Sequence, residues 1–362
     1  NAIMTSTSDE NGAFGFYDVP YGRYIVCEIE TVEGCILNDT PYEVIIDEDG
    51  EAINIEIENE FQMGRIIIEK TGEILMSWEN NDDGTYTPVY EEGGLEGVKF
   101  EIKAAEDIYT PDGVLQYSQG ELIETLVTDE NGRAESKEMY LGNYEVQEVE
   151  TVYGYVLDST IHTIALEYAG DTESIVEEAL DIFNVRQKVD ISLIKNIEGD
   201  DIYGIHPDES SKNVSFGIFA KEEIVASDGS SIPADGTIEV IGVEKAGELF
   251  EGHFTVDIPN GLYYVKEIAK DEHYITNDTV YDVDFSYTDP TLDTVTIAVN
   301  DGEAIDNTLI RGDVIGYKTG DKDKPLAGAV FGIFNKGENQ FTAENAIMTS
   351  TSDENGAFGF YD

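Results

Sequence analysis

Short segments of this chain alternate hydrophobic and polar residues with a period of two. Over residues 188–195 the odd positions before the final lysine carry Val189, Ile191 and Leu193. Side chains of a strand point alternately to opposite faces, so this pattern predicts a strand with one buried face. Turn sequences such as DENG at 9–12 and 129–132 separate such segments. The chain is therefore predicted to be all-β and built of β-sandwiches.

The longest repeat joins the two ends of the chain. Residues 1–18, NAIMTSTSDENGAFGFYD, recur without a change at 345–362, which is 344 positions later. An identity of this length indicates a tandem array. We expect the chain to be an internal window that begins and ends inside one repeating unit.

A shorter, more divergent repeat lies within that period. Three segments end in lysine: GRIIIEK (64–70), KVDISLIK (188–195) and GDVIGYK (312–318). Three end in glutamate: GRYIVCE (22–28), GNYEVQE (142–148) and GLYYVKE (261–267). Three end in asparagine: INIEIEN (53–59), ALDIFN (179–184) and EAIDN (303–307). Each asparagine precedes the next lysine by 11 positions, although the loops vary in length.

The order lysine, glutamate, asparagine divides the chain into Ig-like modules in a linear array. Module two is expected at 64–186 and module three at 187–310. Module one is split between its C-terminal part at 1–63 and its N-terminal part, from the next repeat, at 311–362. Residues 174–180 favour helix by propensity, but the parallel with the other modules predicts that this segment ends as a strand.

In each module the lysine, the glutamate and the asparagine that end these strands lie an even number of positions from apolar residues of the same strand. They are therefore expected on the same face as those apolar residues. Lys70, for example, follows Ile66 and Ile68 in phase. Lys318 has less support, because Val314 is the one large apolar residue that precedes it in phase. The side chains expected to point inward are those of Lys70, Lys195, Lys318, Glu28, Glu148, Glu267, Asn59, Asn184 and Asn307.

An amine, an acid and an amide in one apolar interior can react. Burial favours the neutral amine, a nucleophile, and the protonated carboxyl. That carboxyl can polarise the asparagine carbonyl and relay protons to the leaving ammonia. These residue types predict a Lys–Asn amide cross-link, formed once per module without a cofactor or a metal. A buried Lys–Glu ion pair with asparagine beside it would use the same residues, so residue types alone leave both interpretations open.

Four separated features recur in one order. They are the strand that ends in lysine, the sequence LEGVKF (95–100) or PLAGAVF (325–331), the TDENG or SDENG turn before G-x-Y-x-V-x-E, and the last strand that ends in asparagine. This order resembles the Cna B-type (SpaA-like, prealbumin-fold) domains of Gram-positive surface adhesins and pilins. The resemblance covers essentially the whole chain.

In that family the lysine and asparagine form an intramolecular isopeptide bond, and the glutamate is catalytic. The resemblance implies a Lys70–Asn184 bond with Glu148 and a Lys195–Asn307 bond with Glu267. It also implies that Lys318 joins the equivalent of Asn59 in the following repeat, with the equivalent of Glu28. Module three departs from the pattern, because it lacks DENG and has AKDEHY (269–274) where module two has ETVYGY (150–155).

The chain is strongly acidic, with 77 Asp and Glu against 20 Lys and Arg and a formal charge of −57. Such a surface repels nucleic acids and anionic lipids, so nucleic-acid binding is excluded. No apolar run approaches the length of a membrane span, and no membrane insertion is expected. No Ser/His/Asp, Cys/His or zinc-ligand arrangement appears, so a turnover enzyme is not expected.

Three other features carry weaker signals. Cys27 and Cys35 could form a disulfide in an oxidising compartment, with Cys27 on the outward parity. The tripeptide Arg311-Gly312-Asp313 spells the integrin motif, which chance alone explains. The insertion 71–94 holds the only tryptophan, Trp78. This aromatic and acidic loop could contact a ligand or a neighbouring module, but we expect Trp78 to cover the sandwich of its own module.

Two functions fit these observations. One is a stapled stalk or fibre at an extracellular bacterial surface, cell-wall anchored or in a filament, in which the partners are neighbouring copies of the repeat. The other is the repeat region of an adhesin that itself binds a host or surface ligand. A stalk needs only repetition, whereas an adhesin usually places its ligand site in a distinct terminal domain.

Overall fold

Strands dominate the regular structure, as the two-residue alternation predicts. The computed structural model describes residues 2–361, so Asn1 and Asp362, the outermost residues of the two parts of module one, lie outside the described residues. Within that range the helical elements are short: α1 (Pro207–Ser210) and three 3-10 turns at Ser211–Asn213, Val299–Gly302 and Asp321–Asp323. The predicted all-β class is confirmed.

Contacts divide the chain into two compact units. The first contains the residues up to Gly72 together with Glu92–Val185, and the second contains Glu73–Glu91 together with the residues from Arg186 onward. The long strand β3 (Met63–Asn80) therefore contributes its first part to one unit and its last part to the other.

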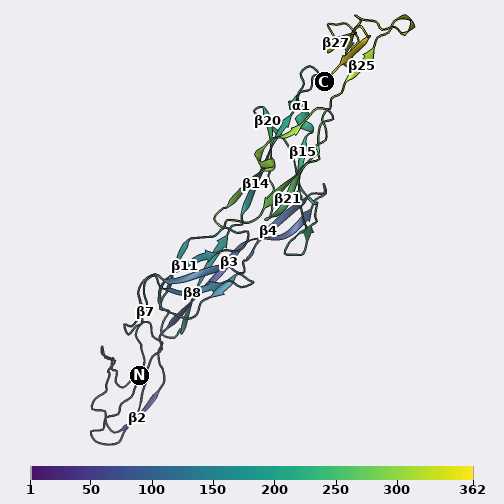
Figure 1. Ribbon diagram of the computed structural model, residues 1–362. Coiled ribbons are helices and arrows are strands. Elements are labelled where there is room, and N and C mark those ends of the chain that lie inside the picture. The colour runs from purple at the N-terminus through teal and green to yellow at the C-terminus, as the bar shows by residue number, and fades with distance from the viewer. Residues whose placement is uncertain (1, 362) are drawn as a thin grey trace. The chain divides into compact units, whose positions relative to one another are not determined.

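The first unit contains a two-sheet sandwich over module two (Figure 1). One sheet joins β3 to β9 (Arg133–Glu135), β10 (Met139–Tyr140) and β13 (Ile175–Asn184). The other sheet has the order β12 (Ile161–Leu166), β11 (Gly142–Glu150), β5 (Lys99–Ala104) and β8 (Leu122–Val127). Alternate residues of β3, β5 and β11 are fully buried: Ile66, Ile68, Phe100, Ile102, Tyr144 and Val146. Residues 175–184 form strand β13, as the parallel with the other modules predicts and contrary to the helix propensity of this segment.

The second unit repeats this architecture over module three (Figure 1). One sheet contains β14 (Lys188–Ile197), β19 (Glu244–Ala246), β20 (Leu249–Phe254), β23 (Thr294–Ala298) and β24 (Ile305–Asn307). The other has the order β18 (Thr237–Gly242), β15 (Ser215–Ala220), β21 (Gly261–Ala269) and β22 (Val280–Phe285). Small hairpins decorate both units: β6 (Ile108–Tyr109) with β7 (Leu115–Tyr117), and β16 (Ile224–Val225) with β17 (Ser231–Ile232).

A tyrosine anchors the start of each strand that carries a predicted catalytic glutamate. Its hydroxyl donates to the backbone carbonyl four residues upstream, from Tyr24 to Pro20 (2.9 Å), from Tyr263 to Pro259 (2.7 Å) and from Tyr144 to Tyr140. This contact is the tyrosine corner of Ig-like sandwiches. Each tyrosine lies four residues before its glutamate, so both side chains are on the same face of the strand. The tyrosine corner therefore fixes the strand that carries the glutamate from its inner face.

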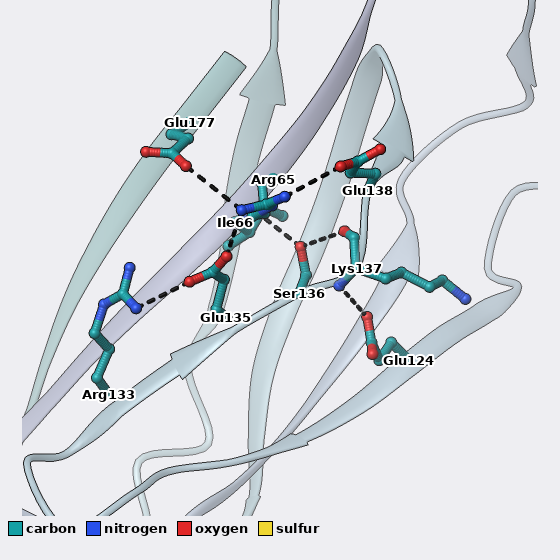
Figure 2. A network of polar contacts seen from close by, with 9 residues as sticks. All are labelled: Arg65, Ile66, Glu124, Arg133, Glu135, Ser136, Lys137, Glu138 and Glu177. Atoms are coloured by element: carbon teal, nitrogen blue, oxygen red, sulfur yellow. Dashed lines mark hydrogen bonds and ion pairs between the residues drawn. The ribbon is translucent and has the colours of Figure 1, made fainter. Parts of the chain in front are cut away.

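A polar network holds the outer face of β3 (Figure 2). Arg65 pairs with Glu135 on β9 (2.6 Å), with Glu138 (3.1 Å) and with Glu177 on β13 (3.7 Å). Ser136 Oγ accepts the backbone N–H of Ile66 at 2.9 Å. Exposed ion pairs contribute about 0–1 kcal/mol each. The main effect of these ion pairs is therefore to fix where β3, which carries Lys70, lies beside its neighbouring strands.

Trp78 lies in a different core from the one that the sequence predicts. Strand β4 (Tyr86–Gly94) pairs with β3, and the hairpin residues Glu73–Glu91 belong to the second unit. The indole is 7% exposed within the hydrophobic core of that unit, and the backbone N–H of Trp78 donates to Ser230 Oγ at 2.8 Å. The expectation that Trp78 covers the sandwich of module two is wrong. Shape complementarity to a core made by distant residues carries no local sequence signal.

The repeated 18-residue sequence adopts two different structures. At the C-terminal copy it forms β27 (Met348–Thr351) and β28 (Ala357–Phe360), which pair with β26 (Val330–Ile333) and β25 (Val314–Tyr317). Over residues 2–18 the same sequence forms no strand. The predicted strand 53–59 is likewise absent, whereas β1 (Gly22–Val26) and β2 (Tyr42–Ile46) pair with each other. Alternation in the sequence specifies a face, but a strand also requires a hydrogen-bonding partner.

Candidate cross-linking sites

The backbone around Lys70 is fixed by the DENG turn. The N–H of Lys70 donates to the Gly132 carbonyl (2.8 Å), and the Lys70 carbonyl accepts the N–H of Leu95 (3.0 Å). Gly132 has φ +80°, and a Cβ there would lie 2.1 Å from the Lys70 carbonyl oxygen. Asp129 Oδ1 accepts the N–H groups of Asn131 and Arg133 at 2.9 Å each and so shapes the turn. Only glycine fits this close approach.

Lys70, Glu148 and Asn184 meet in the interior of module two. The Nζ atom of Lys70 lies 3.2 Å from Glu148 Oε2, and both side chains are excluded from solvent. Asn184 Nδ2 donates to Glu148 Oε1 at 2.7 Å. Asn184 Oδ1 is buried without a hydrogen-bond partner, whereas Lys70 Nζ has Glu148 beside it. Burying an amine is costly, and a reaction that converts the amine into an amide would remove that cost.

Burial controls the charges of this cluster. It raises the pKa of Glu148 and lowers the pKa of Lys70, because each charged form loses its hydration. The attraction between the two groups acts in the opposite direction on each pKa, but burial is the larger cause. Both groups are thus shifted toward the neutral forms that nucleophilic attack on an amide requires.

Module three brings together the corresponding residues. Asn307 Nδ2 donates to Glu267 Oε1 at 2.8 Å, and the fully buried Lys195 donates from Nζ to the Ile305 carbonyl at 2.7 Å. Burial lowers the pKa of Lys195 to about 8 and raises the pKa of Glu267. Glu267 Oε2 and Asn307 Oδ1 are buried without a hydrogen-bond partner.

The two sites share one strand register. Strand β13 runs parallel to β3 with Ile182 opposite Lys70 and Asn184 opposite Gly72. Strand β24 runs parallel to β14 with Ile305 opposite Lys195 and Asn307 opposite Ile197. In both modules the asparagine therefore lies opposite the second residue after the lysine. Because the register repeats, the two sites are structurally equivalent in the placement of lysine and asparagine.

The structure adds a threonine that the sequence reasoning did not single out. Thr151 Oγ1 accepts from Asn184 Nδ2 at 3.0 Å, and Thr31 Oγ1 accepts from Asn59 Nδ2 at 3.0 Å. Each threonine lies three residues after its glutamate, so the common sequence E-x-E-T was the available signal. Module three has Lys270 at this position, and its Nζ donates to the Tyr274 carbonyl at 2.6 Å.

The site residues of module one are divided between the two units of the chain. Asn59 Nδ2 donates to Glu28 Oε2 at 2.6 Å and to the Ile36 carbonyl at 2.9 Å. The four lysines of the first compact unit have other partners: Lys70 with Glu148, Lys99 with Glu150, Lys103 with Glu101, and Lys137 with the Ile123 carbonyl. Lys318, in the second unit, donates to the carbonyl of its neighbour Thr319 at 3.0 Å.

The structure also shows the surroundings of the cysteines and of the RGD tripeptide, which gave weaker signals in the sequence. Cys27 is exposed, Cys35 is buried and both thiols are free, so a disulfide between them stays a prediction. Arg311 of the RGD tripeptide pairs with Glu198 (2.8 Å) and Asp200 (3.1 Å). Across residues 2–361, His, Cys, Asp and Glu side chains form no group of three or more that could hold a metal ion. No helix within the described range is long and apolar enough to span a membrane.

The paired sheets and their buried clusters define a class of protein, the prealbumin-like all-β sandwiches. A comparison with protein families matches residues 1–61 and 83–179 to SpaA, a prealbumin-like fold domain. Over these residues the chain is similar to a SpaA-like prealbumin-fold domain, and the resemblance expected from the sequence is confirmed there.

Among solved structures, one shares the fold of this chain and others are less similar to it. The Bacillus anthracis TIE protein is 17% identical over 90% of this chain, with a TM-score of 0.52, and the chain spans 47% of its length. BcpA, the major pilin subunit of Bacillus cereus, is 16% identical over 83% of this chain and 84% of its own, with a TM-score of 0.32. A C-terminal fragment of the pilus adhesin SpaC from Lactobacillus rhamnosus GG is 14% identical over 69% of this chain and 98% of its own, with a TM-score of 0.36. No curated protein matches the chain.

Proposed function

We propose that this chain is a structural segment of a stalk or fibre on a bacterial surface, hardened by Lys70–Asn184 and Lys195–Asn307 isopeptide bonds. The observation that carries the proposal is a buried lysine and a buried asparagine at the same strand register in two modules, each asparagine donating to a glutamate. The domain match to SpaA supports it, because such domains resemble those of Gram-positive surface adhesins and pilins. The partners would be further copies of the same modules along an extracellular fibre.

The proposed bond forms without a cofactor. The neutral amine of Lys70 attacks Cγ of Asn184, the new C–N bond forms, the Cγ–Nδ2 bond breaks, and ammonia leaves. Glu148, in its protonated form, polarises the amide and then carries the amine proton to the departing nitrogen. Each site reacts once, so the chain would not be a turnover enzyme.

The bond lies on the path that a pulling force would follow. Each lysine is on the first strand of its module, each asparagine is at the end of the last strand, and 11 positions separate one asparagine from the next lysine. Tension would cross each module through the amide and bypass its hydrogen-bonded sheets. Linking the strands also lowers the conformational entropy of the unfolded chain. In the entropic treatment of disulfides, a loop of this length stabilises the folded state by about 4–5 kcal/mol.

Mass spectrometry tests the proposal. The 362-residue chain should be lighter than its sequence by two molecules of ammonia, and digestion should release branched peptides that join position 70 to 184 and 195 to 307. The Lys70→Arg variant should lose one ammonia fewer, whereas Lys99→Arg, at an exposed ion pair, should match the parent. An intact mass equal to that of the sequence would overturn the proposal and favour buried ion pairs.

A further inference from the structure

A buried glutamine follows the site asparagine in two of the three connectors. Gln62 and Gln187 lie three positions after Asn59 and Asn184, and they are 1% and 0% exposed. The third connector has Ile310 at this position. Glutamine is mostly exposed in proteins, because its amide can make up to about four hydrogen bonds with water. Two glutamines buried at equivalent positions therefore need partners inside the protein.

Gln62 binds the loop that leads into β13. Its Nε2 donates to the carbonyls of Gly170 (2.9 Å) and Glu173 (2.6 Å). Its Oε1 accepts the backbone N–H of Ala169 at 2.9 Å. The side-chain amide thus uses its donors and its acceptor on one loop, and each of these partners is a backbone group.

Gln187 makes the equivalent contacts in module three. Its Nε2 donates to the carbonyls of Asp289 (3.3 Å) and Leu292 (3.0 Å), which lie five and two residues before the start of β23. The acceptors of Gln62 likewise lie five and two residues before the start of β13. The two loops, EYAGDTES (167–174) and SYTDPTLD (286–293), differ at most positions. Recognition of backbone carbonyls explains how one glutamine suits both loops.

The contacts of each glutamine lie where a parallel strand pair begins. In module two the pairing starts with Met63, the residue after Gln62, opposite Ile175. In module three it starts with Lys188, the residue after the second glutamine, opposite Thr294. Each glutamine therefore holds the first residues of two parallel strands at one relative position.

Apolar burial alone does not select this register in module two. A slip of one residue would turn Asn184 to the outer face, which the alternation of β13 opposes. A slip of two residues would preserve the alternation, since Ile182 and Asn184 are both buried. It would move Asn184 by about 7 Å along β3 and out of reach of Lys70. Either slip would break the hydrogen bonds of the buried Gln62 amide, which is costly.

We propose that Gln62 is a positioning residue for the Lys70–Asn184 bond: it fixes the register of β3 and β13 at one end, so that the amine and the amide meet at the other. The inference rests on the proposed function, because the register serves that bond. Gln62 lies eight positions before Lys70 and takes no part in the chemistry. It acts before the reaction, because it disfavours the slipped pairing in which the amine cannot reach the amide.

Module three separates its glutamine from its lysine and asparagine. Strand β23 ends at Ala298, the 3-10 turn Val299–Gly302 follows, and pairing with β14 resumes at Ile305. Strand β14 advances by three residues from Ser192 to Lys195, whereas its partner segment advances by seven from Ala298 to Ile305. The extra residues set the register anew, so the glutamine of module three has less control over its bond.

Gln62→Met tests the inference in the full chain, because methionine fills a similar volume without the hydrogen bonds. In freshly refolded protein the bond of module two should form roughly ten-fold more slowly than in the parent, since hydrogen bonds of ordinary strength hold the register. Intact mass and the branched peptides measure the rate. The bond of module three, in the same molecules, should form at the parent rate. Gln187→Met should slow the bond of module three by a smaller factor.

Two control variants separate register from stability. Gln119→Met removes an exposed glutamine that also donates to a backbone carbonyl, and it should change neither rate. Leu126→Ala truncates a buried residue of β8, in the sheet that does not contain β3. Compared at urea concentrations that give the same folded fraction as Gln62→Met, it should stay close to the parent rate.

The register can also be followed without the bond. Asn184→Ala cannot form the bond but retains the ion pair of Lys70 with Glu148. In this background Gln62→Met should speed hydrogen exchange of the backbone amides of β13 and leave β5 and β11 unchanged.

Three results would overturn the inference: a parent rate in Gln62→Met, equal slowing in Leu126→Ala at matched stability, or unchanged exchange in β13. Each is distinct from a failure of the proposed function, in which the parent chain itself would lose no ammonia. A parent that loses two ammonias, together with a Gln62→Met chain that forms both bonds at the parent rate, would refute the role of Gln62 alone.

Discussion

The carbonyl oxygen of Gly132 accepts the backbone N–H of Lys70 at 2.8 Å, and no side chain larger than hydrogen fits at position 132. The glycine of the DENG turn thus fixes the position of Lys70 along its strand. Because Gly132 also has φ +80°, Gly132→Ala would combine backbone strain with a clash against main-chain atoms.

We expect Gly132→Ala to lower the free energy of unfolding of the first unit by more than about 3 kcal/mol and to leave part of the chains without the Lys70–Asn184 bond. Gly113→Ala is the matched control, because Gly113 has φ +85° but open space around its Cβ position. Urea unfolding and intact mass would measure both effects. Equal losses for the two variants would mean that the contact with Lys70 is unimportant.

Glu148→Ala should prevent the bond in module two alone. The variant should be lighter than its sequence by one ammonia, contributed by module three, while the parent chain loses two. It also leaves the Lys70 amine buried without an acid, which costs about 3–5 kcal/mol where a buried pair is broken. Glu150→Ala, in an exposed ion pair with Lys99, should change neither mass nor stability appreciably. A full mass loss in Glu148→Ala would show that another group relays the proton.

An uncross-linked module three should become more stable as the pH rises from about 8 to about 10.5. In Asn307→Ala, Lys195 stays a free amine, and burial holds its pKa at about 8, below the ordinary lysine value. Between those two values the unfolded state binds more protons than the folded state, so stability increases with pH, by roughly 3 kcal/mol in all. The double variant Asn307→Ala/Lys195→Met removes the titrating amine and should lack the increase. Chemical denaturation at both pH values gives the comparison, and parallel pH profiles would contradict the assignment.

Thr151 should speed bond formation without being essential to it. Thr151→Val removes the hydroxyl that accepts from Asn184 Nδ2 at 3.0 Å, a hydrogen bond that contributes about 0.5–1.5 kcal/mol. If that contact aligns the amide, the reaction should slow by roughly 2- to 13-fold, and Thr151→Ser should retain the parent rate. The rate would be followed by mass from freshly refolded protein. An unchanged rate in Thr151→Val would assign the hydroxyl to packing.

Trp78→Ala should weaken the second unit, although the tryptophan lies in a segment that interrupts module two. Its indole is buried among core residues of the second unit, and truncation of such a side chain costs about 3–5 kcal/mol. Hydrogen exchange should become faster in β15 and β21 and stay unchanged in β5 and β11. Tyr109→Ala, an exposed aromatic residue of the first unit, provides the control. Faster exchange confined to β5 and β11 would contradict the packing.

The sequence by itself determined which residues face the interior. Side chains alternate strictly along a strand, so parity placed Lys70, Glu148 and Asn184 on apolar faces before any fold was known. The constant order of lysine, glutamate and asparagine then linked the three as candidates for one site. The structure brings these three together, and in module three it pairs Asn307 with Glu267 while Lys195 donates to the Ile305 carbonyl.

Only the tertiary structure decided which of the equivalent segments became strands and which core each side chain entered. The repeated sequence forms β27 and β28 in its second copy but no strand over residues 2–18, and residues 53–59 form no strand although their alternation is perfect. Trp78 likewise enters a core whose other members lie more than a hundred positions away in the sequence. The physical reason is common to these cases: alternation specifies a face, but a strand's backbone hydrogen bonds and a side chain's packing are completed by partners that are distant in the chain.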